Sequence, residues 1–119
     1  MKYMLLLNRT ADALPEPGTP ELDRIAREYG AAVEAMGRAR VLIDCAALTA
    51  RSSTTTVRVR DGETIITDGP SAEIKEQLGG YTIVECADLD EALEWAAAIP
   101  AARDASVEVR PVAAMQAPV

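Results

Sequence analysis

The chain has 119 residues, 49% of them hydrophobic, which predicts one globular domain with room for a single core. Its 12 Lys and Arg stand against 19 Asp and Glu, and a net charge of −7 excludes a general nucleic-acid binder, because phosphate contact requires a basic surface. There is no His, which excludes Ser-His-Asp and Cys-His catalysis and the usual His-based zinc site. We therefore expect neither a metal nor a cofactor.

The N-terminal half begins with an apolar run, residues 2–8, that predicts a strand buried on both faces. This run ends at Asn8-Arg9 and is too short for a signal peptide, and no stretch is long enough to span a membrane, so we expect a cytoplasmic protein. Thr19 is a good N-cap for an amphipathic helix of roughly 18 residues that ends near Gly37. Its apolar stripe is predicted to consist of Leu22, Ile25, Ala26, Tyr29, Val33 and Met36. Gly30 inside this helix suggests a close neighbour.

The C-terminal half predicts mainly strands. A short strand at residues 41–43 is followed by a hairpin, in which residues 54–60 and 63–67 flank the favoured turn Asp61-Gly62. A strand at 81–86 precedes a helix that begins at Asp88, in a capping box with Glu91, and ends near Pro100. Residues 106–110 form the last strand. The domain is expected to span 1–112, with 113–119 as a flexible tail.

This order of elements predicts a ferredoxin-like α+β fold, with two main helices on one face of an antiparallel sheet and an extra β-hairpin. Two helices cover only one face, yet several strands are apolar on both faces. The second face therefore requires a cover, and the simplest cover is a second copy of the chain. We expect a homodimer formed through sheet faces.

One segment, TDGPSAEIKEQLGGYTIVE at residues 67–85, has an unusual density of Gly, Pro and charge. Gly69 permits a positive φ, Pro70 ends the strand, and Gly79-Gly80 allow close backbone approach where we expect the next strand to start. Together with the stretches at residues 1–6, 55–58, 90–92 and 107–111, this block resembles the DGPF branch of the YCII-related proteins. The resemblance covers nearly the whole chain in the right order.

The resemblance implies a ferredoxin-like subunit that pairs into a dimeric α+β barrel, in a bacterial family largely of unknown function. Some members are similar to proteins encoded beside extracytoplasmic-function sigma factors, which implies a regulatory link. Ser71 stands where the family has Phe after Asp-Gly-Pro, so a pocket beneath it would be wider or wetter. YCII-type proteins are thought to use a His–Asp pair, and that chemistry cannot apply to a chain without His.

We predict a ligand site at Arg58, Asp68, Glu73 and Lys75, which would hold a small polar or anionic ligand. The structural alternative is that Asp68 caps the turn while Glu73 and Lys75 pair on the surface. Strand alternation groups a further set of charged residues by face, which indicates either a cross-strand charge ladder or a polar lining of the barrel. These residues are Arg58, Arg60, Glu85, Glu108 and Arg110. Cys45 and Cys86 form no CxxC pair and are expected to be reduced, buried thiols.

Two classes of function follow. The first is a small-molecule-binding or regulatory homodimer without classical catalytic residues. The second is a dimeric-barrel enzyme that performs proton transfer on a small acidic metabolite, as an isomerase or dehydratase would, with Asp68 or Glu73 as base and Arg58 as anion clamp.

Overall fold

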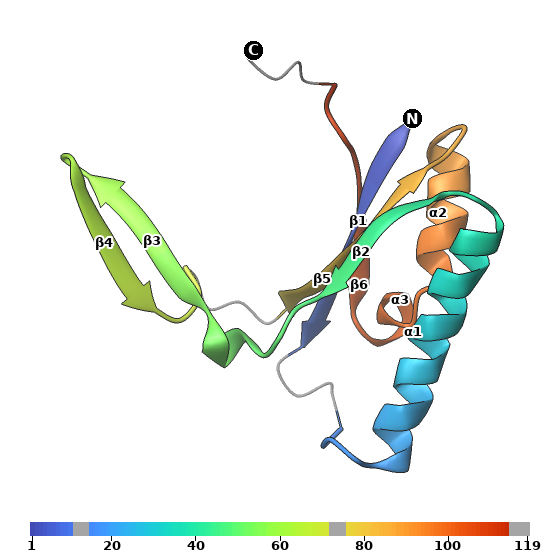
Figure 1. Cartoon of the computed structure of the whole chain (residues 1–119), viewed down its shortest axis with the longest axis horizontal. Coiled ribbons are helices and arrows are strands. Elements are labelled where there is room, and N and C mark those ends of the chain that lie inside the picture. The colour runs from blue at the N-terminus through green and yellow to red at the C-terminus, as the bar shows by residue number, and fades with distance from the viewer. Residues whose placement is uncertain (11–14, 72–75, 115–119) are drawn as a thin grey trace.

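A computed structural model describes residues 1–10, 15–71 and 76–114 of the chain (Figure 1). Its elements in chain order are β1 (Lys2–Thr10), α1 (Pro20–Arg38), β2 (Leu42–Ala47), the 3-10 turn η1 (Arg51–Ser53), β3 (Thr55–Arg60), β4 (Glu63–Asp68), β5 (Glu76–Glu85), α2 (Leu89–Ala97), α3 (Ala101–Asp104) and β6 (Ser106–Pro111). Within these ranges no helix combines the length and the hydropathy needed to cross a bilayer.

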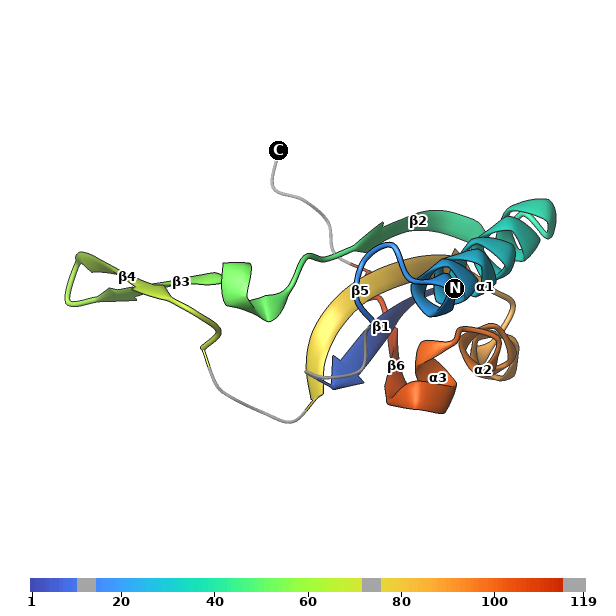
Figure 2. The ribbon, with the colours of Figure 1, turned by 90° about the horizontal axis from the view of Figure 1, so that it is seen from below.

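Four of the strands form one antiparallel sheet in the order β2-β5-β1-β6. The three helices all lie on the same face of this sheet (Figure 2). The chain order, with a helix between β1 and β2 and helices again between β5 and β6, makes this a ferredoxin-like arrangement, and the predicted fold class is confirmed. The short α3 was not expected, because Pro100 looked only like a stop signal, whereas here it caps this extra turn.

The core lies between the helices and the sheet. Strand alternation sends Tyr3 and Leu5 of β1 and Val84 of β5 to the helix side, where they are buried. Met36 covers them from α1, while the small side chains Ala92 and Ala96 let α2 approach the sheet closely. The core is therefore aliphatic and alanine-rich, as the composition predicts.

Both long helices begin at the predicted caps. Thr19 Oγ1 accepts a 3.3 Å hydrogen bond from the Leu22 N–H, and Asp88 Oδ1 accepts one of 2.9 Å from the Glu91 N–H. The Glu91 carboxylate turns inward beside the thiol of Cys86. No neighbour comes close to Gly30, so the expected close contact there was wrong.

The strand after the Asp-Gly-Pro corner begins earlier than predicted, at Glu76 instead of residue 81, so Gly79 and Gly80 lie inside β5. β2 likewise continues to Ala47. A Cβ on Gly80 would lie 2.7 Å from the carbonyl oxygen of Ala46, which explains the glycine by close approach of two strands. Gly79 lies at a bulge, where the pairing with β1 shifts between Leu7 and Asn8.

The predicted hairpin is confirmed, and β3 and β4 pair only with each other. Asp61 and Gly62 both have positive φ, 51° and 78°, as their two-residue turn requires. At its base Gly69 has φ 94°, as expected, and its carbonyl accepts a 2.6 Å hydrogen bond from the Thr56 hydroxyl. These bonds fix the corner at which the chain leaves the hairpin.

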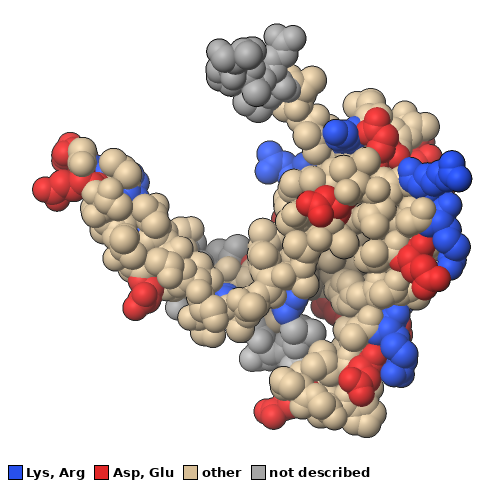
Figure 3. Space-filling view, viewed as in Figure 1, with Lys and Arg blue, Asp and Glu red and all other residues tan. Residues whose placement is uncertain are grey.

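The hairpin projects from the body of the molecule on the side away from the helices (Figures 1 and 2). The Cα radius of gyration is 16.5 Å, whereas a compact domain of this length has about 13–14 Å. In Figure 3 the visible hairpin surface is mostly uncharged, with acidic side chains at its tip. The hairpin is thus an arm, and the remaining elements form the body.

Candidate functional site

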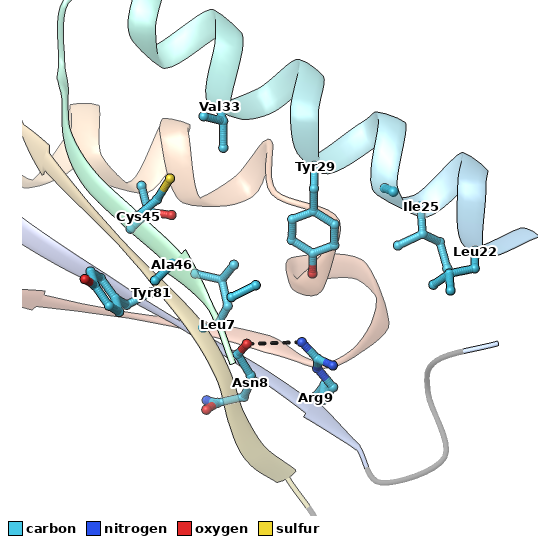
Figure 4. Close-up of a pocket in the computed structure, with 15 residues that line it drawn as sticks. Leu7, Asn8, Arg9, Leu22, Ile25, Tyr29, Val33, Cys45, Ala46 and Tyr81 are labelled. Carbon is cyan, nitrogen blue, oxygen red and sulfur yellow. Dashed lines mark hydrogen bonds between the residues drawn. The ribbon is translucent and has the colours of Figure 1, made fainter. Parts of the chain in front are cut away.

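A cavity of about 480 Å³ lies between α1 and the helix-side face of the sheet (Figure 4). Its lining consists of Leu7, Asn8, Arg9, Leu22, Ile25, Ala26, Tyr29, Val33, Cys45, Ala46, Ala47, Gly79, Gly80, Tyr81 and Thr82. Side chains of Ile25, Tyr29 and Val33 project from α1 toward the sheet. The cavity has the size and the largely apolar wall that are typical of small-molecule sites.

Small residues on the sheet create this space. Opposite α1, the strands β2 and β5 present Ala47, Gly79 and Gly80, so these positions send no long side chain toward the helix. The Arg9 side chain lies over Gly79, and the Ala46 carbonyl lies close to Gly80. The apolar residues of α1 that face this region are consequently half-buried, whereas Met36 at the other end of the helix is fully buried. The N-terminal half of the predicted core stripe therefore forms a cavity wall.

Arg9 brings the main charge to the cavity. It follows the β1 bulge, and its Nη2 donates a 3.1 Å hydrogen bond to the carbonyl oxygen of Gly79. The side chain is half-buried, and among residues 1–10, 15–71 and 76–114 no carboxylate lies within ion-pair distance of it. A guanidinium in this position has N–H groups available for an anion.

Tyr29 supplies a hydroxyl near the same end of the cavity. Burial raises the pKa of Tyr29 above its usual value of 10.0, and the charge of Asp104 acts in the same direction, against the opposing charge of Arg9. The phenol is therefore protonated at neutral pH. It can donate or accept a hydrogen bond, but it is a poor base.

A second cavity of about 330 Å³ adjoins the first, and Arg9 lines both. Its wall is more polar and is made of Arg9, Thr10, Thr49, Ala50, Arg51, Ser52, Gln77, Leu78 and Gly79. Two guanidinium groups and three hydroxyl groups therefore surround the space beyond Arg9. This side of Arg9 suits a polar or anionic group, while the first cavity suits an apolar one.

The predicted site residues are not gathered in this cavity. Arg58 and Asp68 lie on the hairpin, and strand parity places them on opposite faces of it. Nη2 of Arg58 is 3.4 Å from the carbonyl oxygen of Ser71. Glu73 and Lys75 lie outside the described residues. The four-residue site therefore stays a prediction.

The second predicted polar set is divided between two sheets. Arg58 and Arg60 belong to the hairpin, whereas Glu108 and Arg110 belong to β6 in the body. Glu108 accepts a 3.0 Å hydrogen bond from Asn8, and Glu85 lies 3.7 Å from the N-terminal amine. Within one subunit these charges do not form a continuous ladder.

Sequence reasoning missed Arg9 and Tyr29 as site residues. Tyr29 was assigned to the apolar helix stripe, and Arg9 was seen only as the end of an apolar strand. The sequence signal that could have pointed to Arg9 was a single arginine at the end of an apolar strand, in a chain that also contains the pair Gly79-Gly80. Cys86 is buried as expected, but Cys45 is exposed and lines the cavity, so that part of the prediction was wrong. In the described ranges no three His, Cys, Asp or Glu side chains group as metal ligands.

The fold and the cavity define a small ferredoxin-like α+β protein with a cavity between helix and sheet. The chain belongs to the family of the YCII-related domain, which matches residues 1–116, and the resemblance inferred from the sequence is confirmed. An uncharacterized protein of Rhizobium meliloti (strain 1021) is 41% identical over 115 residues, which cover 95% of this chain and 93% of the relative.

A search of solved structures finds a further similarity. It is to the 5-chloro-2-hydroxyhydroquinone dehydrochlorinase of Burkholderia phenoliruptrix AC1100, in complex with 2,5-dihydroxybenzoquinone. The TM-score is 0.49 and the sequence identity 14%, over 95% of this chain and 94% of the enzyme.

Proposed function

We propose that this YCII-related protein is a homodimer that binds a small organic anion in the cavity between α1 and the sheet. The observation that carries the proposal is the half-buried guanidinium of Arg9, which adjoins an apolar cavity and has no carboxylate partner among the described residues. The guanidinium keeps further N–H groups that can donate to an anion. A bound carboxylate or phosphate would supply that anion.

The rest of the ligand should be apolar and compact. Leu22, Ile25 and Val33 line the body of the cavity, and its volume of about 480 Å³ is in the range for ligands of modest size. The Tyr29 hydroxyl and the Arg9 guanidinium offer polar contacts at one end. An aromatic or branched aliphatic carboxylate combines both features.

Binding is better supported than catalysis. Neither a carboxylate nor a histidine is among the cavity-lining residues that the structure describes, and the raised pKa of Tyr29 keeps that phenol protonated. The described cavity wall therefore offers no carboxylate or imidazole as a general base. The enzyme alternative, with Asp68 or Glu73 as base and Arg58 as anion clamp, stays a prediction, and Asp68 lies on the hairpin instead of the cavity wall.

The homodimer is supported by the second face of the sheet. Strand parity places Met4, Leu6, Tyr81 and Ile83 on the face opposite the helices, and we call these four residues the outer sheet face. No described helix covers it. A second copy of the chain could cover it by the same residues on both subunits.

Calorimetric titration with benzoate and hexanoate, compared with benzamide and hexanamide, tests the binding site. The acids should bind and the neutral amides should bind at least about tenfold more weakly, because a charge-assisted hydrogen bond contributes about 1.5–3 kcal/mol. Arg9→Gln should remove this preference. The matched control is Arg24→Gln on the exposed side of α1, where the arginine pairs with Glu28 at 3.0 Å.

Equal affinity for acids and amides, or an Arg9→Gln variant that keeps the preference, would refute the assignment of Arg9. Failure of every carboxylate to bind at millimolar concentration would refute the proposed ligand class.

A further inference from the structure

The hairpin arm has one apolar face that no described element of the chain covers. Pairing sets Val57 opposite Ile66, and Val59 lies on the same face two residues along β3. These side chains are 58%, 68% and 59% exposed, and every residue of β4 is exposed. A two-stranded hairpin without such cover is at best marginally stable in water.

The arm projects on the side of the body that carries the outer sheet face. Figures 1 and 2 both show the helices on one side of the four-stranded sheet and the hairpin reaching away from them. A subunit placed on the outer sheet face would therefore lie beside the arm. A twofold axis would give each subunit the arm of the other.

The surface area that a stable dimer must bury favours a second copy of the chain as the partner that covers the arm. The four strands contain 9, 6, 10 and 6 residues. At about 3.3 Å per residue and about 4.8 Å spacing they present only about 500 Å² per subunit, or about 1,000 Å² for a pair. This is below the roughly 1,200–2,000 Å² of stable interfaces. Each arm offers about 200 Å² on one face, so two arms and the surfaces under them add about 800 Å² more. Only the two contributions together reach the usual range.

We propose that the β3–β4 hairpin is an exchange arm, whose face of Val57, Val59 and Ile66 packs against a second copy of this chain at the margin of the sheet-to-sheet contact. This rests on the proposed homodimer, but it assigns part of the interface to a region outside the sheet. The arm gains its cover from the partner, and the dimer gains the area that the outer sheet face lacks.

Sedimentation velocity over a dilution series from about 0.1 to 100 µM tests the proposal, because dimers with ordinary affinities dissociate in this range. The test variant is Val57→Asp/Ile66→Asp. Its matched control is Ile65→Asp/Thr67→Asp, which places two carboxylates on the opposite face of the same hairpin. The test variant should raise the dimer dissociation constant by at least about 100-fold, since charged groups would be buried at both symmetric contacts. The control should change it by less than about threefold.

Ile83→Asp separates this proposal from the homodimer itself. If Ile83→Asp dissociates the dimer while Val57→Asp/Ile66→Asp does not, the sheet contact stands and the exchange arm is refuted. A wild-type protein that is monomeric throughout the series refutes both. Far-UV circular dichroism at the lowest concentration checks that each variant is folded, since the mutated arm side chains are exposed whereas Ile83 is half-buried.

Hydrogen exchange at residues 55–68 gives an independent measurement on the wild-type protein. The amides of the arm should be protected in the dimer and lose protection on dilution, in parallel with dissociation. Protection that does not depend on concentration would mean that the arm packs on its own chain, and would refute the proposal.

Discussion

Strands of the body and of the arm place aliphatic side chains in opposite environments. β1 is a continuous apolar run and β3 alternates Val with Arg, and Leu5 of β1 is fully buried while Val57 of β3 is 58% exposed. Both strands form, because local pairing and propensity suffice for that. Burial differs because α1 and α2 cover the body and no described element covers the arm. Strand formation and core formation are therefore separate events in this chain.

The largest difference between the two regions should appear on truncation of aliphatic side chains. Leu5→Ala leaves a cavity in the core and should lower the free energy of unfolding by about 2–5 kcal/mol. Val57→Ala, measured at a concentration where the protein is monomeric, should change it by less than about 0.5 kcal/mol. Urea denaturation followed by circular dichroism measures both. A large loss for Val57→Ala in the monomer would mean that the arm belongs to the cooperative core.

The response of stability to alkaline pH should come from the body. Burial, with the hydrogen bond to Glu91, raises the pKa of the Cys86 thiol from 9.0 to about 11. The unfolded chain therefore loses this proton first as pH rises. The contribution of Cys86 to the free energy of unfolding is complete below pH 9 and is lost between about pH 9 and 11.

Cys86→Ser should reduce the loss of unfolding free energy at alkaline pH by at most about 2–3 kcal/mol. Cys45→Ser, at an exposed position, should leave this loss as in the wild type. Urea denaturation at a series of pH values from 8 to 11.5 (about one-half unit apart) compares the three proteins. Identical pH profiles for Cys86→Ser and the wild type would contradict the assignment.

Substitution of two glycines should destabilise the two regions separately. Gly80→Ala sets a Cβ 2.7 Å from the Ala46 carbonyl oxygen and should destabilise the body by about 1–3 kcal/mol through displaced strands. Gly69→Ala meets no neighbour, but its φ of 94° strains any side chain by about 1–2 kcal/mol. Hydrogen exchange should show faster opening of β1 and β5 in the first variant and of the hairpin alone in the second. Faster exchange throughout the body in Gly69→Ala would mean that the arm and the body unfold together.

The smallest effects should be the same in both regions. Arg38 pairs with Glu34 at 2.8 Å on exposed α1, and exposed Arg60 in the arm donates a 2.9 Å hydrogen bond to the carbonyl oxygen of Val59. Arg38→Ala and Arg60→Ala should each change the free energy of unfolding by less than about 0.5 kcal/mol. Melting curves of the two variants, recorded beside the wild type, check this. A larger loss of unfolding free energy in either variant would show that the exposure of a side chain does not by itself determine this change.

Much of the fold could be predicted from local signals. Thr19 and Asp88 begin their helices because a side-chain oxygen accepts a hydrogen bond from a free N–H group of the first turn. Asp61-Gly62 determines a hairpin because both positions require positive φ. The extension of β5 back to Glu76 was missed, since Gly79 and Gly80 disfavour a strand by propensity and are tolerated only because β1 and β2 lie on either side.

The candidate site was less accessible to sequence reasoning. Charged residues near Asp68 attracted attention because they are dense along the chain, but the described members of that set, Arg58 and Asp68, lie on opposite faces of the arm. Arg9 and Tyr29 are distant in sequence and meet only when α1 packs over the sheet. No local pattern encodes that meeting.

The sequence by itself determined the two long helices, the hairpin, the order of the main elements and the aliphatic character of the core, because these depend on interactions between neighbouring residues and on alternation. Tertiary structure decided where the cavity lies, which guanidinium faces it, and which apolar faces stay uncovered. Those properties depend on the volume left between packed elements, where Ala47 and Gly80 place no long side chain. They also depend on how far the hairpin reaches from the sheet.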